Sequence, residues 1–459
     1  MNKLSMMVWI LMVLAFAKAY PQQSPPEQTS FSLQEAINYG LENNYQAINA
    51  QRDIAKALKQ KWETTATGLP QINGEVGYNY NIEVPLSPVP AQFFDPNAQP
   101  GEFAAVPFAP KQSANLTATL TQLIFDGSYI VALEASKTFL DFSKNADNKT
   151  KLEVRKGIIN AYGGVLLTEE NVAILSSNLS TIEENLRETT KIFENGLAEE
   201  EDVEQLKITR SQLANQLNSA QRQVAISRDM LKLALGIPLE TTITLTDDLE
   251  TLAKENMDMA MTQPELELEK NVDYQIAYNL TEQRRLEYKL ERSKSLPSLG
   301  AFVNYGINSF GEDFVFLDAN NAWFDQSTAG LSLTVPIFSS FGRKAAQDRT
   351  KIAWDQAETD LEQQVQQINL DYQRVSSNYQ LAIDNYQTSK DNLALAERIE
   401  NKNSIKFKEG LATSFDLRQA QLQLYSTQSE YLNSMYQVIA EKANLETVLN
   451  TPDFINIQD

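Results

Sequence analysis

The chain has 459 residues and a formal charge of −21 at pH 7. That excess of acid argues against a nucleic-acid partner, because phosphate binding needs clustered lysine and arginine. The chain has neither cysteine nor histidine, which excludes thiol nucleophiles, Cys/His zinc sites, histidine general bases and disulfides. Since no P-loop, dinucleotide fingerprint or nucleophile elbow occurs either, we predict no enzyme, no cofactor and no metal site.

The N-terminus has the pattern of an export signal. One early lysine precedes a short apolar run, and Ala17-Lys18-Ala19 forms an A-x-A cleavage pattern. We therefore predict a secretory signal peptide over residues 1–19 and a linker over 20–31; an uncleaved anchor is the alternative. Elsewhere no apolar run is long enough for a transmembrane helix. The exported protein is then either soluble or crosses a membrane by strands.

Residues 32–236 have the pattern of one structural unit that begins with a helix. Apolar and polar residues alternate from Leu69 to Ile82 and again from Ala114 to Gln122, which predicts two strands. The connection between them, residues 83–112, holds seven prolines and predicts an extended surface loop.

A stretch without proline runs from Lys111 to Ile237 and so includes the second of these strands. It predicts a helix from about Ser128 to Asn195, roughly 100 Å long at 1.5 Å per residue. After a bend, a returning helix is expected, because apolar residues recur on it at coiled-coil spacing. This seam consists of Leu213, Leu217, Ala220, Val224 and Leu231.

The same order of patterns returns in residues 266–459, after an inter-repeat linker at 237–265. The linker is acidic and contains a short β-prone run from Thr241 to Thr246. Alternation predicts two more strands, from Leu296 to Asn308 and from Ala329 to Phe338, and the second proline-free stretch runs from Ile337 to Thr451. We predict an internally duplicated chain with four strands and long coiled-coil helices.

Nearly identical bends support the duplication. FENGLAEEEDVEQ begins at Phe193 and FKEGLATSFDLRQ begins at Phe407, so the copies are 214 residues apart. Each bend carries a glycine, Gly196 or Gly410, just before a helical pattern. Glycine tolerates the backbone of a sharp bend, so both are expected to join two helices.

The strand patterns favour a membrane barrel over half of a soluble sandwich. Their polar faces are rich in Asn, Thr and Ser, and aromatic residues gather near the strand ends, as in membrane barrels. Four strands cannot close such a barrel, which needs about eight, so a membrane-spanning chain must oligomerise. A periplasmic coiled-coil scaffold without a pore remains an alternative, and a secreted enzyme using carboxylate pairs has no support from residue spacing.

The order of these motifs resembles the TolC-type outer-membrane efflux family. LP precedes the odd strands, IFDG (Ile124 to Gly127) and PIFSSFG (Pro336 to Gly342) follow the even strands, and F-x-x-G-L-A-x-x-x-D marks both bends. The likeness covers nearly the whole mature chain. It implies a homotrimer with one 12-stranded β-barrel in outer-membrane lipid and one periplasmic α-barrel. The implied function is an exit duct for efflux or type I secretion, working with a periplasmic adaptor (membrane fusion protein) and an inner-membrane pump.

The resemblance also implies roles for eight residues near the bends. Gly196, Leu197, Gly410 and Leu411 correspond to the adaptor-binding tips; alternatively, the glycines only end a helix. Asp202 and Asp416 correspond to acidic positions of a periplasmic gate, to which Phe407 and Gln419 also belong. Gln419 stands where the family pattern has a second acid, and Phe407 replaces a residue that forms a polar lock. Alternatively, both aspartates are solvated helix-start charges, as is the run from Glu199 to Asp202.

Overall fold

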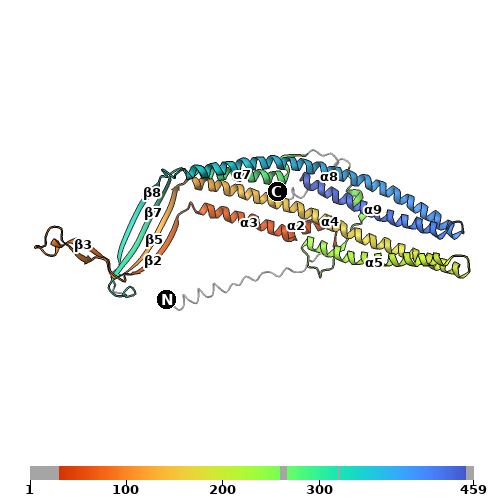
Figure 1. Ribbon diagram of the computed structural model, residues 1–459, viewed down its shortest axis with the longest axis horizontal. Helices are drawn as coiled ribbons and strands as arrows, with labels where there is room; N and C mark the ends of the chain where they lie inside the picture. The colour runs from red at the N-terminus through yellow and green to blue at the C-terminus, as the bar shows by residue number, and fades with distance from the viewer. Residues whose placement is uncertain (1–29, 259–265, 319–320, 451–459) are drawn as a thin grey trace. The chain divides into compact units, whose positions relative to one another are not determined.

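The computed structural model describes residues 30–258, 266–318 and 321–450. The predicted signal peptide and nearly all of the predicted linker at 20–31 lie outside these ranges. Within them the chain is mainly helical with a small number of strands (Figure 1). The predicted fold class, mainly α with a β part, is therefore confirmed.

Two sets of matching elements make up most of the fold. The first set is α3 (Tyr45–Ala66), β2 (Gln71–Tyr80), β5 (Gln112–Phe125), α4 (Gly127–Glu194) and α5 (Glu200–Leu235). The second set is α7 (Val272–Ser293), β7 (Ser298–Gly311), β8 (Phe324–Thr334), α8 (Gly342–Lys408) and α9 (Ser414–Leu449). Matching helices have 22 and 22, 68 and 67, and 36 and 36 residues. Both copies thus build the same hairpin from a very long helix and a shorter returning one.

Each returning helix ends where the short first helix of its own copy begins. The Asn44 side-chain amide donates to the Ala234 carbonyl oxygen at 2.8 Å, and Asn271 donates to the Val448 carbonyl oxygen at 2.8 Å. The same asparagine bond therefore closes the joint in both copies. Carbonyl groups in the last turn of a helix have no hydrogen-bond partner within that helix. Each asparagine donates a hydrogen bond to one such carbonyl oxygen.

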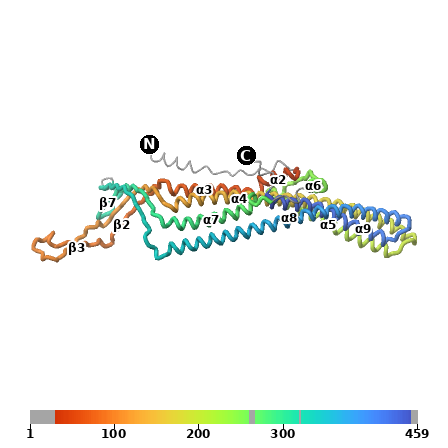
Figure 2. Tube along the Cα trace, turned by 90° about the horizontal axis from the view of Figure 1, so that it is seen from above, coloured from red at the N-terminus to blue at the C-terminus, as the bar shows by residue number. Residues whose placement is uncertain are grey.

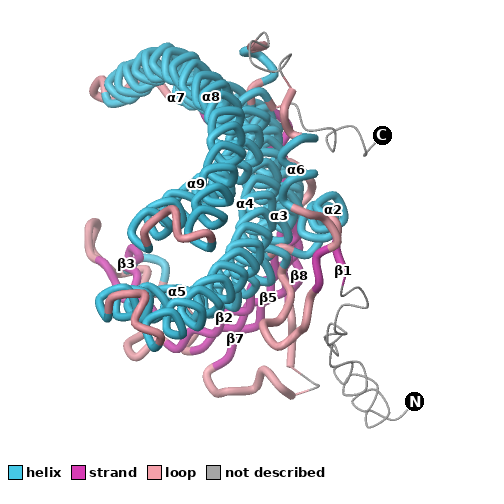
Figure 3. The backbone as a smooth tube through the Cα atoms, turned by 90° about the vertical axis from the view of Figure 1, so that its right-hand side faces the viewer, coloured by secondary structure: helices cyan, strands magenta, loops and turns pink. Residues whose placement is uncertain are grey.

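Chain contacts divide the molecule into two compact units, and both copies contribute to each. The first unit contains the described residues within 1–49, 148–271 and 368–459. Its helices form a curved row in the order α5, α4, α9, α8 (Figure 3). Arg155 of α4 pairs with Glu446 of α9 at 2.6 Å. Ser389 of α8 and Ser434 of α9 are hydrogen-bonded at 2.6 Å.

Hydrogen bonds from a buried tyrosine hold the short elements of this unit to α4. Strand β1 (Ser30–Phe31) pairs in parallel with β6 (Thr244–Leu245), and α2 (Leu33–Asn43) and α6 (Leu249–Glu255) flank them. The fully buried Tyr162 donates toward the Phe31 carbonyl oxygen at 2.9 Å and Asp247 Oδ2 at 3.0 Å. Burial raises the pKa of the Tyr162 phenol, so it stays protonated and keeps its donor role at neutral pH.

The second unit contains residues 50–147 and the described residues within 272–367. Its helices α3, α4, α7 and α8 run along one another (Figure 2). Tyr129 of α4 donates to the Thr65 carbonyl oxygen of α3 at 3.0 Å. Glu134 of α4 pairs with Lys289 of α7 at 2.5 Å, and Thr281 of α7 donates to Ala357 of α8.

A four-stranded antiparallel sheet completes the second unit, with strand order β2-β5-β7-β8. Its register separates two chemically different faces. One row across all four strands is Ile72, Leu120, Val303 and Ala329. The next row is Asn73, Thr119, Asn304 and Thr328. Because neighbouring residues on a strand point to opposite faces, the sheet has one largely apolar face, with Asp325 on it, and one largely polar face, with Glu75 on it.

The prediction of an extended loop over residues 83–112 was wrong. This segment forms a second, two-stranded sheet from β3 (Leu86–Pro90) and β4 (Phe103–Pro107), with the short 3-10 helix η1 (Ala91–Phe93) between them. The Ala91 N–H donates to the Glu102 carbonyl oxygen at 2.8 Å, so Ala91 is at a hydrogen-bonded position of the ladder. Pro90 and Pro88 lie one and three residues before Ala91, at the positions that form no hydrogen bonds across the ladder. Every second residue of an antiparallel ladder needs no N–H donor to its partner, so these prolines leave the ladder intact.

Two further features concern the backbone. In the described part of the chain, no helix is long and apolar enough to cross a membrane. Ser340 and Phe341, between β8 and α8, have φ angles of 48° and 63°. Such left-handed conformations cost about 1–3 kcal/mol each for residues other than glycine, so the surrounding contacts must hold this turn in place.

Candidate functional site

The two hairpin tips have the same backbone geometry. Gly196 and Gly410 have φ angles of 74° and 71°, in the left-handed region that glycine adopts without strain. Gly196 N–H donates to the Phe193 carbonyl oxygen at 2.8 Å, and Leu197 N–H donates to the Ile192 carbonyl oxygen at 3.0 Å. This pair of bonds is the Schellman motif that ends many helices, and the bonds of Gly410 and Leu411 repeat it.

The residue after each glycine is exposed, which is unusual for this motif. A Schellman motif commonly packs that residue against the preceding helical turn. Here Leu197 is 81% exposed and Leu411 is 79% exposed. Each tip therefore presents an apolar side chain that the chain itself leaves uncovered, beside an open glycine.

Both predicted gate aspartates occupy the third position of a returning helix. Asp416 Oδ2 accepts the Thr413 backbone N–H at 3.0 Å and the Thr413 hydroxyl at 2.7 Å, and Thr413 Oγ1 accepts the Asp416 N–H at 3.2 Å. This is a capping box. The Thr413 hydroxyl bond and then its backbone bond lower the pKa of Asp416, so its carboxylate is ionised at neutral pH.

The structure brings Asp202 into contact with the other tip. Its Oδ2 accepts the Glu199 N–H at 3.4 Å, and its Oδ1 accepts a hydrogen bond from the Ser414 hydroxyl. Ser414 is the first residue of α9, so this bond joins the starts of α5 and α9. The two acids thus differ in their partners, although they occupy equivalent positions in the two copies.

The remaining predicted gate residues lie apart from this contact. Phe407 is half-buried in the last turn of α8, where its carbonyl oxygen accepts the Gly410 N–H at 3.0 Å. Gln419 lies one turn after Asp416 on α9, and its side chain is exposed. Within the described residues, no group of acidic side chains has the arrangement of a metal site.

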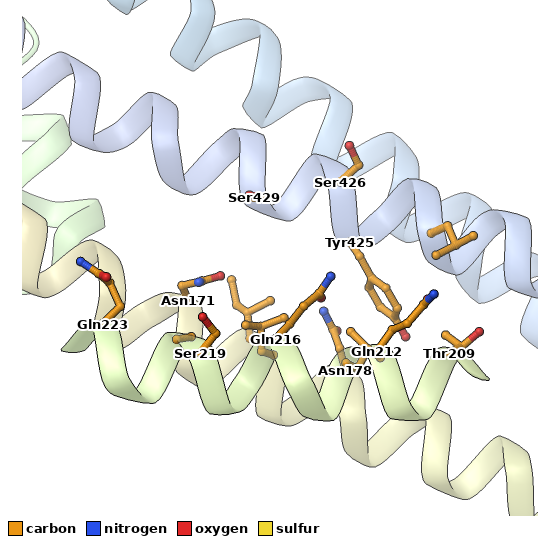
Figure 4. Close-up of a pocket in the computed structure, with 15 residues that line it drawn as sticks. Asn171, Asn178, Thr209, Gln212, Gln216, Ser219, Gln223, Tyr425, Ser426 and Ser429 are labelled. Carbon is orange, nitrogen blue, oxygen red and sulfur yellow. The ribbon is translucent and has the colours of Figure 1, made fainter. Parts of the chain in front are cut away.

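A cavity of about 590 Å³ lies between α5 and α9, over α4. Figure 4 shows Tyr425 reaching from α9 toward Gln212 of α5 and Asn178 of α4. Asn178 donates to the Gln428 side chain at 2.9 Å. The 15 lining residues include no acidic or basic side chain, and burial raises the pKa of the Tyr425 phenol. The cavity is thus neutral and rich in hydrogen-bonding groups.

Sequence reasoning missed this cavity, although a signal for it exists. Uncharged polar residues recur every three or four positions on α5, beside the apolar seam; they are Thr209, Gln212, Gln216, Ser219 and Gln223. Residues at this spacing share one helix face. The seam itself is confirmed, because Leu213, Ala220 and Leu231 are buried.

Comparison with known proteins gives one family and a set of structures. Residues 264–451 match the family model described as outer membrane efflux protein. The outer membrane protein VceC from Vibrio cholerae is similar at 17% identity and TM-score 0.69, over 91% of this chain and 95% of that chain. CusC, whose structures are described in terms of transmembrane channel formation, is similar at 16% identity and TM-score 0.73, over 94% and 95%.

A third structure shares the fold at a similar level. The Campylobacter jejuni CmeC outer membrane channel is similar at 16% identity and TM-score 0.72, over 93% of this chain and 88% of that chain. A comparison with curated proteins gives no match. The structural likenesses extend over almost the full chain, so the fold of both copies is shared with these proteins.

Proposed function

Because residues 264–451 match the family model described as outer membrane efflux protein, we propose that this chain is an outer-membrane exit duct. It passes substrates from a periplasmic adaptor and an inner-membrane pump to the exterior, in an efflux or type I secretion system. The observation that carries this proposal is the two-faced sheet, with one largely apolar face and one largely polar face. Such faces suit a wall between lipid and water.

The sheet also supports the proposed trimer. Its edge strands, β2 and β8, have 10 and 11 residues and no strand partner on their outer sides in the described chain. A membrane sheet must close, because lipid offers no hydrogen-bond partners to an open edge. Three copies pairing β8 with β2 supply a barrel of twelve strands, and their helices supply the periplasmic α-barrel. The protein is then located in the outer membrane and extends into the periplasm.

Membrane extraction distinguishes this duct from a periplasmic coiled-coil scaffold. A barrel should stay in the outer-membrane fraction after a carbonate wash and should migrate as a heat-sensitive trimer on gels. Release into the wash as a heat-insensitive species would favour the scaffold and refute the duct.

We propose that the tips bind the adaptor through Leu197 and Leu411, beside Gly196 and Gly410. Burying a leucine side chain contributes about 1.5–3 kcal/mol. Leu197→Asp or Leu411→Asp should therefore weaken adaptor binding roughly 10- to 150-fold, while trimers still form because both side chains are exposed in the single chain. Leu280→Asp, an exposed position on α7, is the matched control. Normal efflux and adaptor pull-down by both tip variants would contradict tip docking.

We further propose that the gate lies at the start of the returning helices. Asp416, kept ionised by Thr413, would give a threefold assembly a negative ring that favours cations. Asp202, Phe407 and Gln419 complete this region, with Phe407 closing it by apolar packing. Asp416→Asn should reduce cation preference and block by multivalent cations in planar bilayers. Unchanged selectivity together with unchanged block would place Asp416 away from the pore.

A further inference from the structure

The cavity over α4 has a counterpart in the second copy. Counting forward by the repeat spacing of 214 residues, the α4 residues that line the cavity correspond to residues of α8. Asn171, Ile174, Leu175 and Asn178 correspond to Asn385, Thr388, Ser389 and Asn392. All four of these α8 residues line a groove between α8 and α9 that also has a volume of about 590 Å³. The duplicated chain therefore carries the same groove in both copies.

The two grooves differ in their chemistry. The first cavity has five apolar lining residues, which are Ile174, Leu175, Leu213, Ala220 and Leu422. All the residues that line the second groove are polar. One of them, Glu430, is acidic, and the first cavity has Gln216 at the corresponding position. The first cavity thus combines apolar patches with uncharged polar groups, and the second groove does not.

Tyr425 of α9 distinguishes the first cavity further. It reaches from one side of the cavity toward the polar residues of α5 (Figure 4). Its hydroxyl oxygen is buried, and no group in the described part of the chain forms a hydrogen bond with it. A buried hydroxyl group without a partner destabilises a folded chain, so this donor suits an acceptor on a ligand. Ser211, the residue of α5 that corresponds to Tyr425, is exposed.

The lining of the first cavity selects a class of ligand. Ten of its 15 residues are polar and none is charged, so a charged ligand would lose its hydration without gaining a counter-charge. Sites for drug-sized molecules are mostly apolar with a few polar groups, and the opposite proportion here favours a ligand with many hydrogen-bonding groups. Saccharides carry hydroxyl groups around the ring edge and C–H groups on the ring faces. They therefore match amide and hydroxyl side chains that alternate with apolar patches.

We propose that this cavity binds an uncharged saccharide. The saccharide ring packs on the apolar patches, and its oxygen atoms accept hydrogen bonds from the Tyr425 hydroxyl and from the amide groups of Gln212 and Gln216. Figure 3 shows α5 and α9 on the two arms of the curved row and α4 at its back, so the cavity opens on the concave side. The place of the site in a duct rests on the proposed function, because the proposed α-barrel makes this side its inner wall. Uncharged saccharides are then molecules that the duct holds on their way out.

Protection of an introduced cysteine tests the site, and the absence of natural cysteine makes each introduced one the single labelled residue. Ser219→Cys lies in the first cavity, and Asn433→Cys is the matched control at the corresponding position of the second groove. Both native side chains are exposed, so a methanethiosulfonate reagent should reach these positions. The full chain in detergent micelles is labelled without sugar, with the uncharged disaccharide trehalose, or with its charged counterpart trehalose 6-phosphate.

We expect trehalose to slow the labelling of residue 219 several-fold and to leave the labelling of residue 433 unchanged. Trehalose 6-phosphate should need a several-fold higher concentration for the same protection, because no basic side chain lines the cavity. No protection of residue 219, or equal protection of both cysteines, would overturn the site, and equal protection by both sugars would overturn its preference for uncharged ligands. The carbonate wash tests the duct independently. Protection of residue 219 in a chain that the wash releases would support the saccharide site and refute its place in a duct.

Two variants in the Ser219→Cys chain test the contacts with the saccharide. Tyr425→Phe removes only the hydroxyl group and should raise the trehalose concentration for half protection roughly two- to tenfold. Urea unfolding of this variant should not shift to lower urea, because the hydroxyl group has no partner within the described chain. Gln216→Glu, at an exposed position, gives the first cavity the acid of the second groove and should weaken protection by a similar factor. Unchanged half-protection concentrations in both variants would show that trehalose binds elsewhere and would overturn the proposal.

Discussion

The two faces of the sheet predict that a single arginine substitution has a large effect on one face and a small effect on the other. Leu120 lies in the apolar row with Ile72 and Val303, whereas its neighbour Thr119 lies in the polar row with Asn73 and Asn304. An arginine on the lipid face near the middle of a membrane strand costs roughly 2–4 kcal/mol. Leu120→Arg should therefore lower the folding equilibrium constant roughly 30- to 700-fold. The arginine of Thr119→Arg would point into water, and its effect should stay within about 0.5 kcal/mol.

The assay is urea unfolding of the refolded protein in vesicles, together with the yield of heat-sensitive trimers on unheated gels. Val303→Arg should behave like Leu120→Arg, because these residues are cross-strand partners on one face. Leu120→Met controls for loss of the leucine shape alone. Equal tolerance of arginine at positions 119 and 120 would refute the assignment of the two faces.

Three smaller perturbations test the rest of the structure. Gly236→Ala should destabilise the chain by more than about 2 kcal/mol, because a Cβ at this residue, whose φ is 76°, would lie 2.2 Å from the Asn43 carbonyl oxygen. Asn450→Gly, at the equivalent left-handed position of the second copy, is the control and should change the free energy of unfolding little in the same urea titration. Tyr162→Phe should cost about 1–3 kcal/mol in urea unfolding, because it removes the donor to Asp247. The pKa of Asp416 is lower in the folded chain than in the unfolded chain. Its capping bond should therefore stabilise α9 fully above the unfolded pKa of about 3.9, and this stabilisation should be lost as the pH falls through the folded pKa. Circular dichroism should show a loss of helix on acidification that is absent in Asp416→Asn.

Much of the fold follows from local sequence patterns. The expected helix from about Ser128 to Asn195 agrees with α4 to within one residue at each end, because proline and glycine placement limits helices locally. The strand expected from Ala329 to Phe338 instead ends at Thr334. Pro336 lacks the N–H that a ladder needs, and the strained turn takes up the residues after it.

Other features depend on partners far away in the sequence. Nothing near Asn44 predicts that α2 ends and α3 begins there, because its amide nitrogen bonds Ala234 while its Oδ1 accepts the Gln46 N–H at 2.7 Å. The bond between Ser414 and Asp202 joins residues from different copies. The glycine bends could be predicted from the sequence, because glycine adopts a left-handed backbone without strain. Hydrogen bonds between residues far apart in the sequence can be identified only from the folded structure.

The unpaired edges of the sheet have a consequence for the time before assembly. Before the proposed assembly, the outer edges of β2 and β8 expose two rows of backbone N–H and C=O groups beside the apolar face of the described sheet. Such edges pair readily with unrelated strands, so correct association competes with aggregation. The helical hairpins bury their own seams within one chain and can fold early. In the proposed trimer, the rate at which chains meet would then limit assembly, so a periplasmic protein that covers the open sheet edges would raise the yield of trimers.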